Sequence, residues 1–147
     1  MNFLLDTMVV SEWVKQRPHP GVVAWVADAD EDRVFISVAT LAELRYGIER
    51  MAGGGRRKRL DDWLRNDLPS RFEERVIPID APVADHWGTV VARSEAAGRQ
   101  ISSMDAWIAA TALARGMTLI TRNTSDFEAV IERMINPWRN HDEKAHD

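Results

Sequence analysis

Four carboxylates in the sequence have positions that are compatible with a metal-binding or catalytic role as well as with ordinary surface charge: Asp6, Glu43, Asp105 and Asp126. Asp6 directly ends an apolar run, and a carboxylate there is costly unless a positive group meets it. If the four side chains gather within a few ångströms of one another, their repulsion raises one or more of their pKa values, and a divalent cation removes that repulsion. Magnesium prefers such oxygen ligands. Bound there, it would activate a water for in-line displacement at a phosphoryl group.

Three of these carboxylates also have a purely structural explanation. Glu43 follows Thr40 by three residues, which is the spacing of a helix capping box, and Ser125 to Glu128 repeats that pattern around Asp126. Asp105 lies near the start of a predicted helix, where the positive end of the helix dipole would stabilise a carboxylate by roughly 0.3–1 kcal/mol. Taken one at a time, these structural explanations are the better ones. The prediction of a site therefore depends on the joint placement of all four.

Two hydroxyl side chains stand beside the predicted carboxylates. Thr7 follows Asp6, and Thr121 ends the apolar run before Asp126. Either hydroxyl could orient a metal ligand or a water. Ordinary threonines at strand ends are an equally good explanation.

The elements that must position these side chains alternate between strands and helices. Short apolar runs predict strands, and spacings of three and four predict helices. This alternation predicts an α/β fold, with a central parallel sheet of about five strands in three α/β/α layers. Chemistry in such sheets gathers at the carboxyl ends of the strands. The expected strands are 3–5, 34–38, 76–79 (an edge strand, because it contains Pro78), 118–121 and 134–135; the expected helices include 9–14, 40–51, 56–68, 80–98 and 103–115.

The length of the chain suits one domain. We expect residues 1–138 to form it and the charged residues 139–147 to be a frayed tail. No apolar run approaches the ~20 residues that span a bilayer. The start lacks the basic region, longer apolar stretch and cleavage site of a secretory signal, so the expected location is the cytoplasm.

Composition excludes several kinds of site. The chain has no cysteine, which excludes disulfides, thiol catalysis and thiolate zinc sites, and its four histidines match no zinc motif. A metal should therefore be bound by oxygen. The net charge of −4 argues mildly against a protein that binds nucleic acid through a broad basic surface. Local basic clusters can still hold a strand beside an acidic metal site.

One such basic cluster follows Gly53–Gly55. A phosphate-binding loop needs a preceding strand and a Gly-Lys-Ser/Thr ending, so these glycines are better explained as a hinge. The cluster Arg56, Arg57, Lys58 and Arg59, with Arg65, could contact RNA phosphates, and a solvated helix face is an equally good explanation. Arg45 lies near Glu43 and could bind phosphate or pair with an acidic neighbour.

Several of these segments together resemble the acidic motifs of PIN-domain ribonucleases, and more narrowly those of VapC (FitB-like) toxins of bacterial toxin–antitoxin pairs. The resemblance extends from Asn2 to about Trp138. It implies a parallel sheet, a Mg²⁺ or Mn²⁺ site, cleavage of single-stranded or looped RNA, a homodimer, and a small antitoxin whose C-terminal segment occupies a groove. The segments that carry it are Leu4–Thr7, Ala42–Ile48, Asp105–Ala112, Thr121–Phe127 and Asn136–Trp138.

Matched residue by residue, the resemblance places all four carboxylates on catalytic positions and implies that Asp6, Asp105 and Asp126 hold the metal. Thr121 and Asn123 fall on the polar positions around the last carboxylate. Two departures stand out. Met8 occupies a position where such toxins usually carry Asn, and Ala129 and Ile131 stand where relatives often carry glycines. Neither departure removes a predicted ligand.

Two other functions compete with a ribonuclease. Asp6 could be the nucleophile of a phosphatase, although the common pattern needs a second Asp two positions later, where this chain has Met8. The domain could instead lack catalytic activity and only bind a protein or RNA. Met8, at a position where such toxins usually carry Asn, is compatible with this alternative.

Overall fold

A five-stranded parallel sheet forms the centre of the computed structural model, which describes residues 1–139. The sheet order is β3-β2-β1-β4-β5, so β1, which precedes Asp6, is its central strand. This confirms the predicted parallel sheet, and Pro78 directly follows the edge strand β3. The strands are β1 (Phe3–Leu5), β2 (Val34–Ser37), β3 (Val76–Ile77), β4 (Thr118–Ile120) and β5 (Met134–Ile135).

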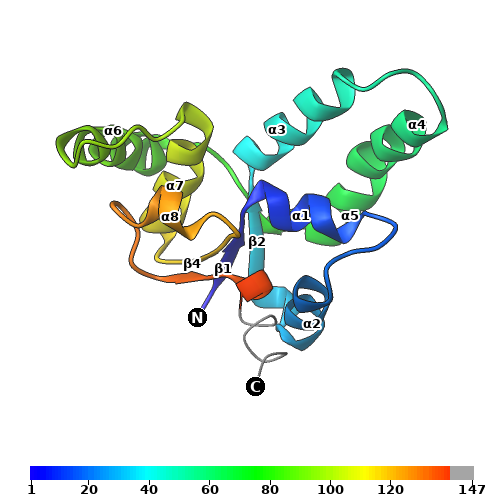
Figure 1. Cartoon of the computed structure of the whole chain (residues 1–147), viewed down its shortest axis with the longest axis horizontal. Coiled ribbons are helices and arrows are strands. Elements are labelled where there is room, and N and C mark those ends of the chain that lie inside the picture. Colours follow the sequence, from blue (N-terminus) through cyan, green and yellow to red (C-terminus); the bar gives the residue numbers. More distant parts are fainter. Residues whose placement is uncertain (140–147) are drawn as a thin grey trace.

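Helices cover both faces of the sheet, which confirms the three layers (Figure 1). Leu5 and Ile120 face a core formed with α1, α2, α3 and α5, whereas their neighbours Leu4 and Leu119 face a core formed with α6 and α7. Strands buried on both faces need apolar residues at successive positions, as these short runs have. The helices are α1 (Thr7–Trp13), α2 (Pro20–Asp28), α3 (Val38–Glu49), α4 (Gly55–Asp62), α5 (Leu68–Phe72), α6 (Ala81–Ala96), α7 (Ser103–Arg115) and α8 (Thr124–Phe127); short 3₁₀ turns span Glu31–Arg33 and Glu73–Arg75, and a π-helical turn spans Trp63–Asp67.

Two helices begin earlier than their apolar spacing predicts. α1 starts at Thr7 rather than Val9, because the carboxylate of Asp6 accepts the Thr7 N–H at 2.8 Å and so caps the helix at the strand end. α3 is capped by Ser37, whose hydroxyl accepts the Thr40 N–H at 3.3 Å. The prediction of Thr40 as the cap was therefore wrong, and with it the capping-box explanation of Glu43.

The other predicted helix ends are close to those observed. Asp80 caps α6 by accepting the Val83 N–H at 3.1 Å, and α7 ends at Gly116, whose φ of 63° suits glycine. None of the helices within residues 1–139 is long and apolar enough to cross a membrane. The predicted tail falls, apart from Arg139, outside the described residues, so the predicted division of the chain stays a prediction.

Candidate active site

Asp6 lies at the centre of the carboxyl edge of the sheet. Its side chain is only 4% exposed, and its two oxygens accept hydrogen bonds from the Thr7 N–H at 2.8 Å and the Thr121 hydroxyl at 2.7 Å. Burial raises the pKa of Asp6 above its ordinary value of 3.8; the two donors lower it, and the nearby carboxylates of Glu43 and Asp126 raise it. A buried carboxylate among other carboxylates is a group that a cation would stabilise.

Glu43 is tied to the same place by threonine hydroxyls. Thr7 donates from Oγ1 to Glu43 Oε1 at 2.6 Å, and its Oγ1 lies 3.0 Å from Thr40 Oγ1. Because the single hydroxyl hydrogen of Thr7 is directed at Glu43, Thr40 is the donor in the second contact. Thr7 therefore links the cap of α1 to the carboxylate on α3.

Thr40 is the site residue that sequence reasoning missed. It is fully buried and lies one turn before Glu43 on the same side of α3. The signal was present in the spacing of three residues, which places both side chains on one helix face, but that spacing was explained as a capping box.

Asp105 and Asp126 complete the group. Asp105 is half-buried at the start of α7, where Ser102 caps the helix by accepting the Asp105 N–H at 3.1 Å. Burial, followed by the charge of Asp6, raises the pKa of Asp105; the Ser102 hydroxyl lowers it, and Asp126 raises it further. Asp126 is exposed on α8, which follows β4. The fold thus brings all four predicted carboxylates into electrostatic contact, although Asp6 and Asp126 are 120 positions apart in the chain (126 − 6).

The arrangement suits a cation that keeps much of its water. Within residues 1–139, no three acidic or histidine side chains stand close enough together to enclose one ion. The donors are carboxylate and hydroxyl oxygens, the ligand type that Mg²⁺ prefers, and Mg²⁺ commonly binds one or two carboxylates and retains several waters. The donor set therefore fits a divalent metal.

Thr121 and Asn123 lie beside Asp6 in different ways. Thr121 is fully buried, donates to Asp6 and accepts the Asn123 N–H at 3.1 Å. The side-chain amide of Asn123 instead lies 3.1 Å from the sulfur of Met8. Met8, the departure noted in the sequence, thus contacts the loop after β4 and contributes no oxygen to the site.

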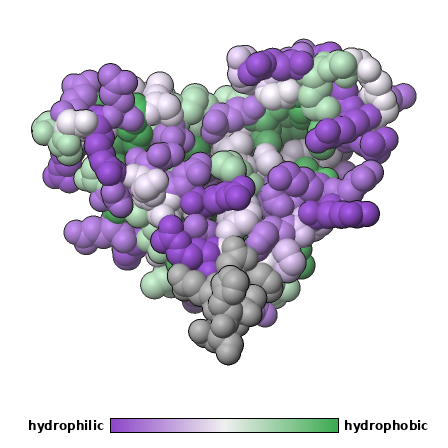
Figure 2. Space-filling model, viewed as in Figure 1, coloured by the Kyte–Doolittle hydropathy of each residue, from purple (hydrophilic) through white to green (hydrophobic). Residues whose placement is uncertain are grey.

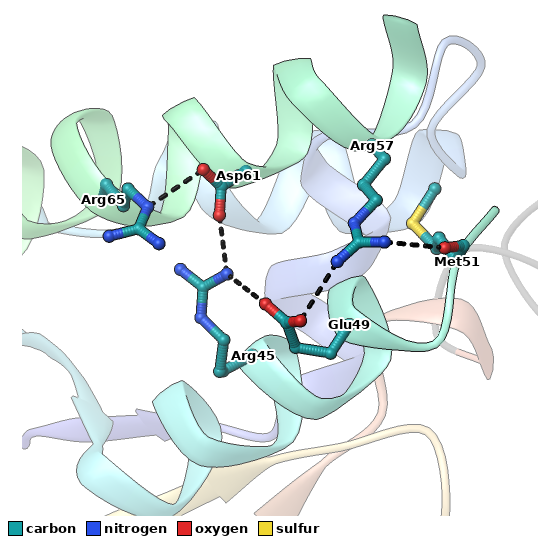
Figure 3. A network of polar contacts seen from close by, with 6 residues as sticks. All are labelled: Arg45, Glu49, Met51, Arg57, Asp61 and Arg65. Carbon is teal, nitrogen blue, oxygen red and sulfur yellow. Dashed lines mark hydrogen bonds and ion pairs between the residues drawn. The ribbon is translucent and has the colours of Figure 1, made fainter. Parts of the chain in front are cut away.

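The residues predicted to contact phosphates differ in whether they already pair with acidic side chains. Arg45 pairs with Asp61 at 2.6 Å, and Arg57 pairs with Glu49 at 3.0 Å (Figure 3). Arg56 lines a cavity that also contacts Glu43. Lys58 is exposed and does not line that cavity. That these four residues bind RNA stays a prediction.

Comparison with known proteins decides the family. The PIN domain profile matches residues 3–132, most of the chain. The chain belongs to the PIN-domain family. VapC ribonuclease Y4jK of Sinorhizobium fredii is 36% identical to this PIN domain over 135 residues, 92% of this chain and 96% of that protein. Toxin FitB of Neisseria gonorrhoeae is 35% identical over 135 residues, 92% of this chain and 97% of that one.

A solved structure agrees with the sequence relatives. The crystal structure of FitAcB from Neisseria gonorrhoeae superimposes with a TM-score of 0.86 at 34% identity, covering 92% of this chain and 98% of that chain. The predicted resemblance to VapC and FitB-like PIN domains is thus confirmed, and so is the fold. The roles of individual site residues remain predictions.

The raised pKa of Asp105 has a consequence for stability. The folded metal-free PIN domain holds the Asp105 proton more tightly than the unfolded chain does, so this group makes stability fall as pH rises from about 3.8 through the raised pKa. We expect Asp105→Asn to raise the melting temperature of the metal-free protein at pH 7, and this gain to vanish below about pH 4.

Asp67→Asn is the matched control, because Asp67 is exposed and its side chain has no hydrogen-bond or ion-pair partner within residues 1–139. Thermal melts in EDTA across this pH range make the comparison. Equal melting temperatures for both variants at pH 7 would show that Asp105 is not under electrostatic strain.

Proposed function

We propose that this PIN-domain protein is a metal-dependent endoribonuclease and the toxin of a toxin–antitoxin pair, inhibited by a small antitoxin. The observation that carries the proposal is the electrostatically coupled set Asp6, Glu43, Asp105 and Asp126 at one sheet edge. The names of its relatives, a VapC ribonuclease and a FitB toxin, support the same activity. We further propose that the protein forms a homodimer and that it is located in the cytoplasm.

The proposed reaction is hydrolysis of an RNA phosphodiester. Asp6, Asp105 and Asp126 would hold Mg²⁺ or Mn²⁺, in part through waters that the ion keeps, because the three do not enclose it directly. Thr121 and the Thr7 N–H fix the orientation of Asp6. When bound, the cation lowers the pKa of a water and stabilises charge on the phosphoryl oxygens.

Glu43 is oriented by Thr7 through Oε1, and its Oε2 accepts no hydrogen bond within residues 1–139, so it can take the proton of the attacking water. The water oxygen bonds to phosphorus, one bridging P–O bond breaks, and the departing oxygen gains a proton from solvent.

The burial of Asp6 argues against the phosphatase alternative. A nucleophile must reach the phosphorus, but Asp6 is 4% exposed and each of its oxygens already accepts a hydrogen bond. A metal ligand needs only a remaining lone pair on one oxygen.

The direct test is to incubate the purified chain with mixed RNA in Mg²⁺, in Mn²⁺ and in EDTA. We expect cleavage only with metal. At 100 times its Kd the metal should also stabilise the fold by about 2.7 kcal/mol, which raises the melting temperature by roughly 5–10 °C. Absence of both effects would identify an idle scaffold and contradict the proposal.

A further inference from the structure

A cavity of about 750 Å³ opens from the candidate active site. Thr7 and Glu43 line it on the side of the carboxylates, and Arg56 and Arg59 line it on the side of α4. Its remaining surface is mostly apolar. Figure 2 shows a hydrophobic hollow with hydrophilic residues around it in the region of α3 and α4. We call this cavity between α1, α3 and α4 the α4 groove.

One face of α4 and of the turn after it holds the helix to α3. Arg57, Asp61 and Arg65 recur every four residues and so share a face. In Figure 3 the side chains of Arg57 and Asp61 reach the α3 residues Glu49 and Arg45, at 3.0 and 2.6 Å. Asp61 also pairs with Arg65 at 2.9 Å. These cations are already neutralised by acidic partners, which fixes the orientation of α4.

The neighbouring face of α4 presents the other arginines to the groove. Arg56, Arg59 and Leu60, spaced by three and four, all line it, and Trp63 follows one turn later. Within residues 1–139, neither Arg56 nor Arg59 forms an ion pair or a side-chain hydrogen bond. Their positive charges are therefore available to a ligand, in contrast to those of Arg45, Arg57 and Arg65.

We propose that Arg56 and Arg59 bind phosphates of a single RNA strand that runs along the α4 groove from the carboxylate site. This inference rests on the proposed function, because a substrate cut beside Glu43 must continue over a surface that adjoins it. The groove is such a surface, and its two uncommitted cations offset the repulsion between the phosphates and the carboxylates. The bases lie against the apolar floor at Leu60 and Trp63.

The test measures binding of a labelled single-stranded RNA of mixed sequence to the full chain. Asp105→Asn is used as the background so that the RNA is not cut. Arg56→Gln and Arg59→Gln should each raise the Kd about 3- to 10-fold and lower the slope of log K against log salt by about 0.7. Arg93→Gln is the matched control, because it removes one positive charge at an exposed position on α6, outside the groove, and it should change the Kd less than about 2-fold. In the otherwise wild-type chain, the two arginine variants should raise KM and leave kcat unchanged.

The proposal is overturned if Arg56→Gln and Arg59→Gln affect RNA binding no more than Arg93→Gln does. It is also overturned if a polyglutamate peptide binds the groove more tightly than RNA, since the site then belongs to a protein segment. Should the wild-type chain bind RNA through both arginines without cutting it, the proposed function fails and the groove assignment stands. Should it cut RNA while both variants behave as Arg93→Gln does, only the groove assignment fails.

Discussion

Asp6→Asn is expected to lower the rate of metal-dependent RNA cleavage by about 10²–10⁴-fold, because the charge stabilisation lost with a metal ligand amounts to several kcal/mol. Asp6 is the carboxylate for which this effect should be largest. It is the most buried of the four, it follows the central strand, and it interacts electrostatically with Glu43, Asp105 and Asp126. Initial rates on a defined RNA at saturating Mg²⁺ measure the change.

The substitution should leave the fold intact. Asparagine retains an oxygen that can accept the Thr7 N–H and so cap α1, and it removes a buried charge. The melting temperature in EDTA should therefore equal or exceed that of the wild type. Asp85→Asn, at an exposed position on α6, is the matched control and should cut RNA at the wild-type rate. A folded Asp6→Asn variant with wild-type activity would remove Asp6 from the site.

The sequence was sufficient to predict the sheet and the place of its carboxylates. The three central strands β1, β2 and β4 are short, mainly apolar runs buried on both faces, a pattern that depends little on partners far along the chain. Parallel strands have their carboxyl ends at one edge, so Asp6 after β1 and Asp126 after β4 had to lie near each other.

Contacts that depend on how two helices meet were not predictable in this way. The hydrogen bond from Thr7 to Glu43 joins residues 36 positions apart. It depends on which side of α3 faces α1, and that orientation follows from a helix that is capped by Ser37, three residues earlier than predicted. Likewise, Arg45 had candidate acidic partners along the sequence, but its pairing with Asp61 follows only from the packing of α4 on α3.

A third difference lies after α4. The segment 56–68 was predicted as one helix, but a π-helical turn interrupts it at Trp63–Asp67. Pro69 follows shortly after and has no N–H to donate to the carbonyl four residues before it, at Arg65, so regular α-helical hydrogen bonding cannot continue there. This proline was visible in the sequence, but which irregular turn would result was not.

Thr121→Val is expected to reduce cleavage by about 10–100-fold through an effect on Asp6, because residues that orient a metal ligand typically contribute this much to affinity or activity. Valine has nearly the shape of threonine, so the change removes the donor to Asp6 and the acceptor of the Asn123 N–H with little change in packing. Without that donor the pKa of Asp6 rises further, which weakens metal binding at a given pH. The loss of two buried hydrogen bonds should also cost about 1–3 kcal/mol of stability.

The same strand offers an unusually close control for Thr121→Val. Thr118 is also buried on β4, but its hydroxyl has no hydrogen-bond partner among residues 1–139. Thr118→Val should therefore be neutral or stabilising, with wild-type activity and metal affinity, because it removes a buried polar group that makes no hydrogen bond. Thr121→Ser, which keeps the hydroxyl, should restore most of the activity. If Thr121→Val and Thr118→Val bind metal equally well, Asp6 does not depend on its hydroxyl partner, and the role assigned to Thr121 is wrong.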